Sequence, residues 1–86
     1  MTRIHIDRSP HARAAMEPGD FDLICAECIA AGIDGVTLSG ERATGPFTAR
    51  ISGGYRAQAW TPLLAFQRAV DMRRRAMEYG ELAGEF

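Results

Sequence analysis

The sequence predicts an α+β domain in which a mostly antiparallel sheet of three or four strands is covered on one face by helices. Three observations support this fold class. Residues 2–7 and 35–60 contain strand-length stretches with period-two alternation. Apolar residues recur at helical spacing in residues 20–32 and 62–77. The last three strands follow one another closely enough to form a meander. The expected order is strand, helix, helix, strand, strand, strand, helix, in a single domain spanning residues 1–86.

The first strand and the first helix follow from local patterns near the N-terminus. "TRIHID" alternates Ile4 and Ile6 with polar residues, as a half-buried strand does. Ser9 followed by Pro10 predicts a helix start, because a serine hydroxyl can cap the first turn and proline suits the first helical position. A short helix over "SPHARAAM" is therefore expected.

A longer helix is predicted from Asp20, as its N-cap, to Gly32, as its C-terminal stop. We expect the apolar stripe of this helix, which includes both cysteines of "CAEC", to face the core. Its residues are Phe21, Ile24, Cys25, Cys28 and Ile29. The strand "GVTLSG" follows, with Val36 and Leu38 expected to point inward.

The stretch "FTARISGGYRAQAW", residues 47–60, predicts a hairpin in which the loop length decides what each face carries. A two-residue Gly53-Gly54 loop would mix apolar and charged side chains on both faces, so that neither could pack on a core. The three-residue loop Ser52-Gly53-Gly54, a type I turn closed by a left-handed glycine, pairs Ile51 with Tyr55 and collects the apolar residues on one face. We therefore predict the three-residue loop.

This register places Arg50 opposite Arg56 on the polar face of the hairpin. A like-charge pair in that position costs roughly a few tenths of a kcal/mol. Paired arginines beside a tryptophan are typical of a contact surface. The alternative is the solvated side of an ordinary antiparallel sheet, with the tryptophan packed beneath the last helix. The predicted partner-binding residues here are Thr48, Arg50, Arg56, Gln58 and Trp60, and Thr37 and Ser39 of the neighbouring strand extend the face.

The last helix begins at Thr61-Pro62, a hydroxyl N-cap followed by proline. Gly80 is expected to end it, and residues 81–86 are expected to form a frayed tail. The core-facing stripe is expected to consist of Leu63, Phe66, Val70 and Met77.

Charge is unevenly distributed along a chain whose formal net charge is −1. Residues 14–41 contain six acidic residues and no basic one, whereas residues 42–75 contain seven arginines and one acidic residue. All basic residues are arginine, so each basic contact is a planar fork of donors. The run Arg73, Arg74 and Arg75 is either a solvated helix end or an anion-facing patch continuous with the arginine face of the hairpin. An alternative acidic surface, which would mimic nucleic acid, consists of Glu17, Asp20, Asp22, Glu27 and Asp34.

Few residues suggest chemistry. "CAEC" together with His5 and His11 would supply the ligands of a zinc site, and a C-x-x-C pair is also a redox motif. The cysteines lie on the expected apolar stripe, which favours buried structural thiols. A set of Ser9, His5 and Asp7 lacks the turn and the oxyanion donors of a nucleophile site. We expect no enzyme activity, no cofactor and no metal.

Two stretches resemble known families. From Asp20 onward, the helix-strand-strand-strand-helix order and the "GPF" opening of the middle strand resemble the double-stranded RNA-binding domain. That family holds phosphate with lysines where this chain has "TPLLAF", so the resemblance implies the topology alone. The layout of "FTARISGGYRAQAWTPLLAFQRAVDM" is similar to that of small phage and mobile-element accessory proteins, including anti-CRISPR inhibitors. This second resemblance implies a non-enzymatic protein that occupies a surface of a larger complex.

The leading hypothesis is therefore a small binding module that inhibits or modulates a protein or nucleoprotein complex. The alternative is a nucleic-acid-binding module that uses the arginine-rich sheet face and the last helix. A third hypothesis is a homodimer seeded by Leu23 and Leu64, which lie off their helices' core stripes. Apolar runs are too short to span a membrane, so a cytoplasmic location is expected.

Overall fold

The computed structural model describes the backbone of residues 4–84 and the side chains of residues 4–78. It confirms the predicted fold class and element order. The elements are β1 (His5–Arg8), α1 (Pro10–Ala15), α2 (Asp20–Ala31), β2 (Gly35–Gly40), β3 (Phe47–Ile51), β4 (Tyr55–Ala59) and α3 (Pro62–Gly84).

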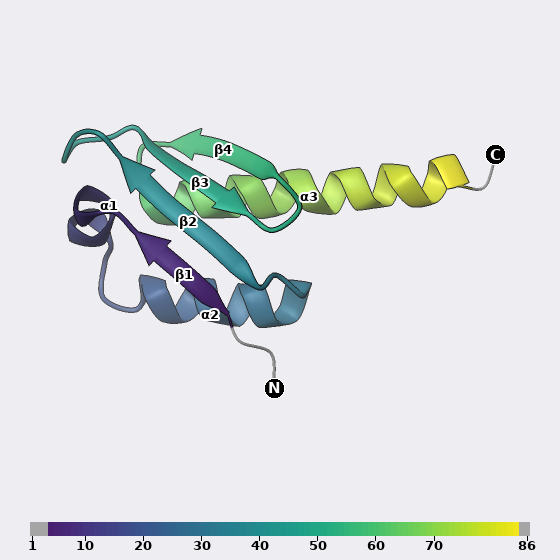
Figure 1. Cartoon of the computed structure of the whole chain (residues 1–86), viewed down its shortest axis with the longest axis horizontal. Helices are drawn as coiled ribbons and strands as arrows, with labels where there is room; N and C mark the ends of the chain where they lie inside the picture. Colours follow the sequence, from purple (N-terminus) through teal and green to yellow (C-terminus); the bar gives the residue numbers. More distant parts are fainter. Residues whose placement is uncertain (1–3, 85–86) are drawn as a thin grey trace.

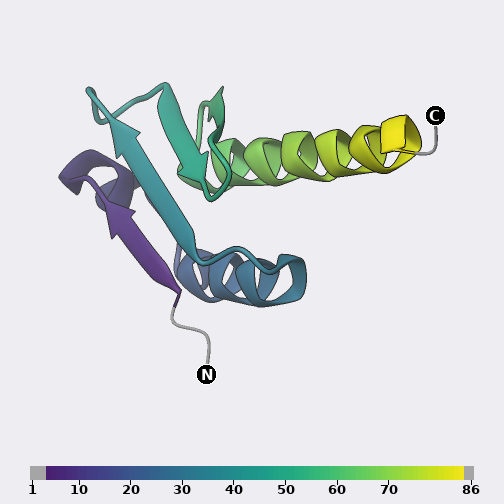
Figure 2. The same ribbon diagram turned by 45° about the vertical axis from the view of Figure 1, so that its right-hand side comes forward.

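The four strands form one mixed sheet in the order β1-β2-β3-β4. β2, β3 and β4 are a true antiparallel meander, and β1 pairs parallel to β2 at one edge. α2 and α3 lie on the same side of the sheet (Figures 1 and 2). Residues 4–84 therefore form two layers, and in this part of the chain one face of the sheet carries no helix.

The predicted register of the hairpin is confirmed, since Ile51 pairs with Tyr55 and Arg50 pairs with Arg56. The predicted turn type is wrong. Gly53 has φ of 96° and Gly54 has φ of 86°, whereas the third position of a type I turn has φ of about −90°. The positive φ at Gly53 is the sign that a type II turn requires, and glycine adopts it without steric cost.

The extra loop residue, Ser52, also holds the hairpin turn against the start of β2. Its Oγ accepts a hydrogen bond from the Gly35 N–H at 2.9 Å and donates one to Asp34 Oδ1. The Ser52 N–H donates to the Gly35 carbonyl at 3.0 Å. Ser52 therefore fixes the β2–β3 pairing as well as the loop length.

The core lies between the helices and the inner face of the sheet. Phe47, Ala49 and Leu38 alternate with polar residues along their strands, as period two requires, and all three are buried. Phe66 of α3 packs into the same cluster. The remaining buried members are Ala12, Ile24, Cys28, Ile33, Val36, Ile51, Ala59, Ala65, Ala69 and Val70.

The predicted N-caps of the two flanking helices are confirmed. Ser9 Oγ accepts from the Ala12 N–H at 3.2 Å, and Thr61 Oγ1 accepts from the Leu64 N–H at 3.2 Å. β1 extends to Arg8, one residue past its predicted end, because that residue continues the pairing with β2. Residues 2 and 3 of the predicted strand lie outside the described part of the chain.

Two predictions for α2 are wrong. Gly19, not Asp20, is the N-cap residue, and Asp20 Oδ2 instead accepts from the Glu17 N–H at 2.9 Å in the preceding turn. The predicted stripe is only partly buried, because Phe21 is 39% and Ile29 is 73% exposed. α2 lies near the β1–β2 edge of the sheet (Figure 1) and buries one flank of that stripe. The Arg8 guanidinium covers the Phe21 ring, 4.7 Å from its centroid.

Two predictions for α3 are also wrong. The helix continues to Gly84 instead of ending at Gly80, since a single glycine costs a helix only about 1 kcal/mol. Met77, expected in the core, is 51% exposed because this part of α3 extends past the end of the sheet (Figure 2). The expected fraying of residues 81–86 stays a prediction, because their side chains and residues 85–86 lie outside the described part.

Within residues 4–84, no helix combines the length and the apolar character needed to cross a membrane.

The packing of Phe47 against Gly40 generates a stability prediction. A Cβ added to Gly40 would lie 2.6 Å from Cδ1 of the buried Phe47 ring. We expect Gly40→Ala to destabilise the fold by about 1–3 kcal/mol through overpacking. Gly35→Ala in the same strand is the matched control, because its Cβ would meet Ser52 Oγ at an ordinary 3.5 Å. Urea unfolding of both variants measures the difference, and equal stabilities would contradict this packing.

Candidate functional site

On β2, β3 and β4, the uncovered side of the sheet, called here the outer face, carries two rows of polar residues. One row is Thr37, Arg50 and Arg56, and the other is Ser39, Thr48 and Gln58. Each row takes one residue from each of β2, β3 and β4. Five of these residues are exposed and Thr48 is half-buried. The predicted separation of polar from apolar side chains is therefore found across three strands.

The hydrogen-bond pattern brings the two facing arginines close together. The Ser52 N–H donates to β2, so alternate β3 residues, including Arg50, also direct their N–H groups toward β2. Arg50 and Arg56 consequently form a non-hydrogen-bonded pair, in which opposite Cα atoms lie about 4.5 Å apart. This is the closest approach that an antiparallel ladder gives to two side chains.

Neither of these guanidinium groups is neutralised within the described part of the chain. Among the side chains of residues 4–78, no salt bridge or hydrogen bond involves Arg50 or Arg56. Asp7 of β1 pairs with Thr37 of β2, which in turn pairs with Arg50 of β3. Asp7 and Arg50 are therefore two strand spacings, about 10 Å, apart. The Asp7 carboxylate instead contacts His5 Nε2 at 3.2 Å.

Two adjoining hollows lie on the outer face, and together they are called here the trough. A hollow of about 250 Å³ is lined by Thr37, Ser39, Thr48, Arg50 and Arg56. A second hollow of about 520 Å³ shares Ser39 and Thr48 with the first and adds Gln58, Gly40, Glu41, Arg42, Gly45 and Pro46. The second hollow was not anticipated, because nothing in the sequence indicates how the 40–46 loop folds beside the sheet.

Gln58 makes two hydrogen bonds, one within the Ser39, Thr48 and Gln58 row and one to α3. Gln58 Nε2 donates to Thr48 Oγ1 at 3.2 Å. The Gln58 backbone carbonyl accepts from Arg68 Nη1 of α3 at 3.0 Å. That second bond covers one of the backbone groups that β4, as an edge strand, would otherwise present to another chain.

Trp60 is exposed, so the part of the alternative that packed it beneath the last helix is wrong, whereas the solvated sheet face is compatible with either interpretation. Its side chain is 71% exposed, immediately after the end of β4. Tryptophan side chains are seldom this exposed on a protein surface, and they are frequent anchors at interfaces. It supplies an apolar group at one end of the arginine-bearing strand.

The run Arg73-Arg74-Arg75 does not join the outer face, because α3 lies on the opposite side of the sheet (Figure 1). The three side chains have different environments. Arg73 Nη1 donates to the Ala31 carbonyl at 2.9 Å, Arg75 forms an ion pair with Asp71 at 3.1 Å, and Arg74 is exposed. They do not form one anion-facing patch.

The predicted acidic surface is likewise not a single surface. Asp20 is buried and bonded to the Glu17 N–H, and Asp34 accepts from Ser52. These two residues lie at opposite ends of α2, a helix about 18 Å long. Glu17, Asp22 and Glu27 are exposed.

The residues singled out for chemistry are not brought together. Ser9 Oγ caps α1, while His5 and Asp7 are exposed on the uncovered side. Cys28 lies in the core on the helix side of the sheet. Among the side chains of residues 4–78, no group of three or more His, Cys, Asp and Glu residues is arranged to hold a metal ion.

Burial raises the pKa of the Cys28 thiol to about 11, and the neighbouring Cys25 and Glu27 act in the same direction. Cys25 is half-buried, and both thiols are free. The Cys28 thiol is therefore protonated, and hence a poor nucleophile, throughout the neutral pH range.

Comparisons with models of known protein families, with curated proteins and with solved structures find no match. The resemblances to double-stranded RNA-binding domains and to anti-CRISPR-type proteins therefore stay predictions.

The different environments of the two cysteines generate a reactivity prediction. At pH 8 we expect a maleimide to label Cys25 in the folded protein and Cys28 only after unfolding, because a thiol with a pKa of about 11 is ionised to roughly 0.1% at that pH. Mass spectrometry of Cys25→Ser and Cys28→Ala variants assigns the label. Labelling of Cys28 in the folded protein at the rate of Cys25 would contradict its placement in the core.

Proposed function

We propose that this protein is a non-enzymatic binding module that holds an acidic surface of a larger protein or nucleoprotein complex on its outer face, and so inhibits or modulates that complex. The observation that carries the proposal is the arginine pair. Arg50 and Arg56 face each other across β3 and β4, a like-charge pairing that destabilises a sheet, and no salt bridge among the side chains of residues 4–78 involves either of them. A bound carboxylate or phosphate group would remove that repulsion.

The chemistry of the trough suits carboxylate recognition. A guanidinium presents two parallel N–H donors to a carboxylate, and two such forks side by side can bind neighbouring acidic side chains. The hydroxyl groups of Thr37, Ser39 and Thr48 supply adaptable donors and acceptors around the pair. Trp60 adds the aromatic contact that interfaces commonly use.

A protein partner is favoured over direct nucleic-acid binding. The two rows of the outer face contain no aromatic residue, and the exposed Trp60 beyond the end of β4 is a single ring rather than a series on which successive bases would stack. The chain has no lysine and a net charge of −1, so sequence-independent attraction to phosphate is weak. The acidic Asp22 and Glu27 are also exposed on the remainder of the surface.

The direct test removes both arginines. Affinity capture from the native host with the wild-type protein identifies the partner, and calorimetry then measures its binding to Arg50→Ser/Arg56→Ser. We expect a loss of about 2 kcal/mol or more, roughly 30-fold in affinity, because truncated anchors cost that much. Arg13→Ser/Arg75→Ser is the matched control. It changes the net charge equally at exposed positions away from the outer face.

Three outcomes would contradict the proposal. One is unchanged affinity of the folded Arg50→Ser/Arg56→Ser variant, and another is an equal loss in the control variant. The third is tight binding to duplex DNA or to RNA that weakens steeply with salt, which is the signature of phosphate contacts and would favour the nucleic-acid alternative.

A further inference from the structure

The C-terminal half of α3 extends beyond the sheet (Figure 1), and Arg73 bonds it to the end of α2. Among the described side chains of residues 4–78, Val70 is the last residue of α3 in the core cluster. From Asp71 to Gly84 the helix continues for about 20 Å, at 1.5 Å per residue, and projects beyond the sheet (Figures 1 and 2). A helix segment of this length gains little stability alone in water, so packing against another element would stabilise it.

This projecting segment continues the apolar stripe that α3 buries elsewhere. Met72, Ala76 and Met77 follow the helical spacing of the core residues on the same side. Met72 is 47% and Met77 is 51% exposed. The stripe is therefore interrupted only by Arg73, whose guanidinium is bonded to the end of α2.

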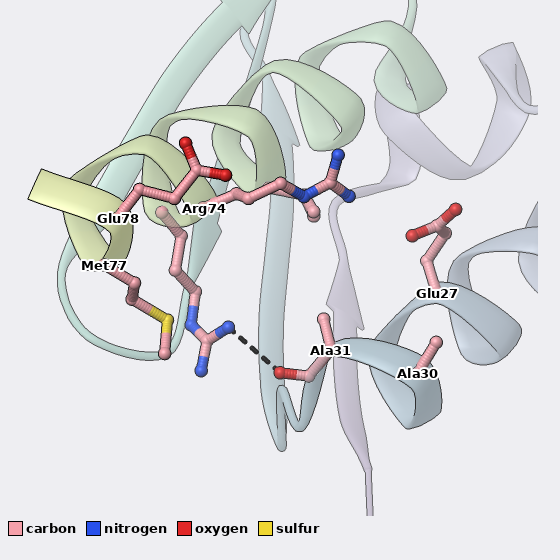
Figure 3. Close-up of a pocket in the computed structure, with 8 residues that line it drawn as sticks. Glu27, Ala30, Ala31, Arg74, Met77 and Glu78 are labelled. Atoms are coloured by element: carbon pink, nitrogen blue, oxygen red, sulfur yellow. Dashed lines mark hydrogen bonds between the residues drawn. The ribbon is translucent and has the colours of Figure 1, made fainter. Parts of the chain in front are cut away.

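A cleft of about 290 Å³ lies between this stripe and the C-terminal end of α2 (Figure 3). Its apolar walls are Ala30, Ala31, Val70 and Met77, and the Arg73 bond to the Ala31 carbonyl holds the two helices together (Figure 3). The remaining lining residues are charged, namely Glu27, Arg74 and Glu78. Within residues 4–78, no salt bridge involves any of these three side chains.

We propose that this segment pairs with the same segment of a second copy of the chain, with the two helices antiparallel and the twofold axis near Ala76. In this arrangement Met77 of each copy lies level with Arg75 of the other copy and packs against Ala76 of that copy, at the mouth of the cleft. The interface is isologous, so each contact occurs twice. The proposal is independent of the proposed function, because the outer face lies on the other side of the sheet.

Charge complementarity identifies the occupant as a second copy. An axis at Ala76 sets Arg74 opposite Glu78 of the second copy, and Glu78 opposite Arg74. Arg74 and Glu78 are one turn apart on one flank of the helix, and antiparallel helices bring equivalent flanks together. A parallel arrangement would oppose like charges. Ala76 at the axis has a side chain small enough for close approach of the helices.

Sedimentation velocity over a wide concentration range tests the proposal. We expect a reversible dimer of the wild-type chain. Met77→Ser should raise its dissociation constant at least tenfold, whereas Ile29→Ser, an equally polar change on an exposed side of α2, should leave it unchanged. Glu78→Arg should raise the constant roughly tenfold, because two pairs are replaced by repulsion. The swap Arg74→Glu/Glu78→Arg should restore the wild-type value.

Cysteine cross-linking tests the position of the axis. In a Cys25→Ser background, Ala76→Cys should form an intermolecular disulfide on mild oxidation, and Ala14→Cys on α1 should not. A chain that stays monomeric at every concentration overturns the proposal. So does a dimer that Met77→Ser and Glu78→Arg do not weaken. Loss of the dimer leaves partner binding by the outer face unaffected, so the two proposals fail separately.

Discussion

The pairing of Ile51 with Tyr55 across a three-residue turn is the constraint on which the rest of the structure depends. A shift by one residue would exchange the two faces of β4 relative to β3. Ser52 stabilises this pairing in two ways. It lengthens the turn by one residue, and its hydroxyl group forms hydrogen bonds with Asp34 and Gly35 at the start of β2. This register produces the apolar face that packs on α3. It also produces the polar face that carries Arg50 and Arg56.

Local chemistry explains what could be predicted of the fold. The caps at Ser9, Thr61 and Gly32 act within one helical turn, so the residues themselves specify them. The rotation of α2 and the point at which α3 leaves the sheet are set by contacts between distant segments. The sequence therefore could not show that Ile29 and Met77 are exposed, although both follow an apolar period.

The same distinction applies to the candidate site. Arg50 and Arg56 could be placed because their relation depends only on the hairpin register. Asp20, Asp34 and Arg73 could not, because their hydrogen-bond partners are backbone groups or a distant serine that charge counting does not identify. Neighbouring residues of like charge, such as Arg73 and Arg75, consequently have different partners although they lie on one helix.

The most direct test of the register is a nuclear Overhauser measurement between the Hα protons of β3 and β4. In a non-hydrogen-bonded antiparallel pair these protons face each other. The account predicts strong effects between Arg50 and Arg56 and between Thr48 and Gln58. A strong effect between Arg50 and Ala57, the pairing of a two-residue loop, would contradict it, because the polar and apolar side chains would then no longer separate.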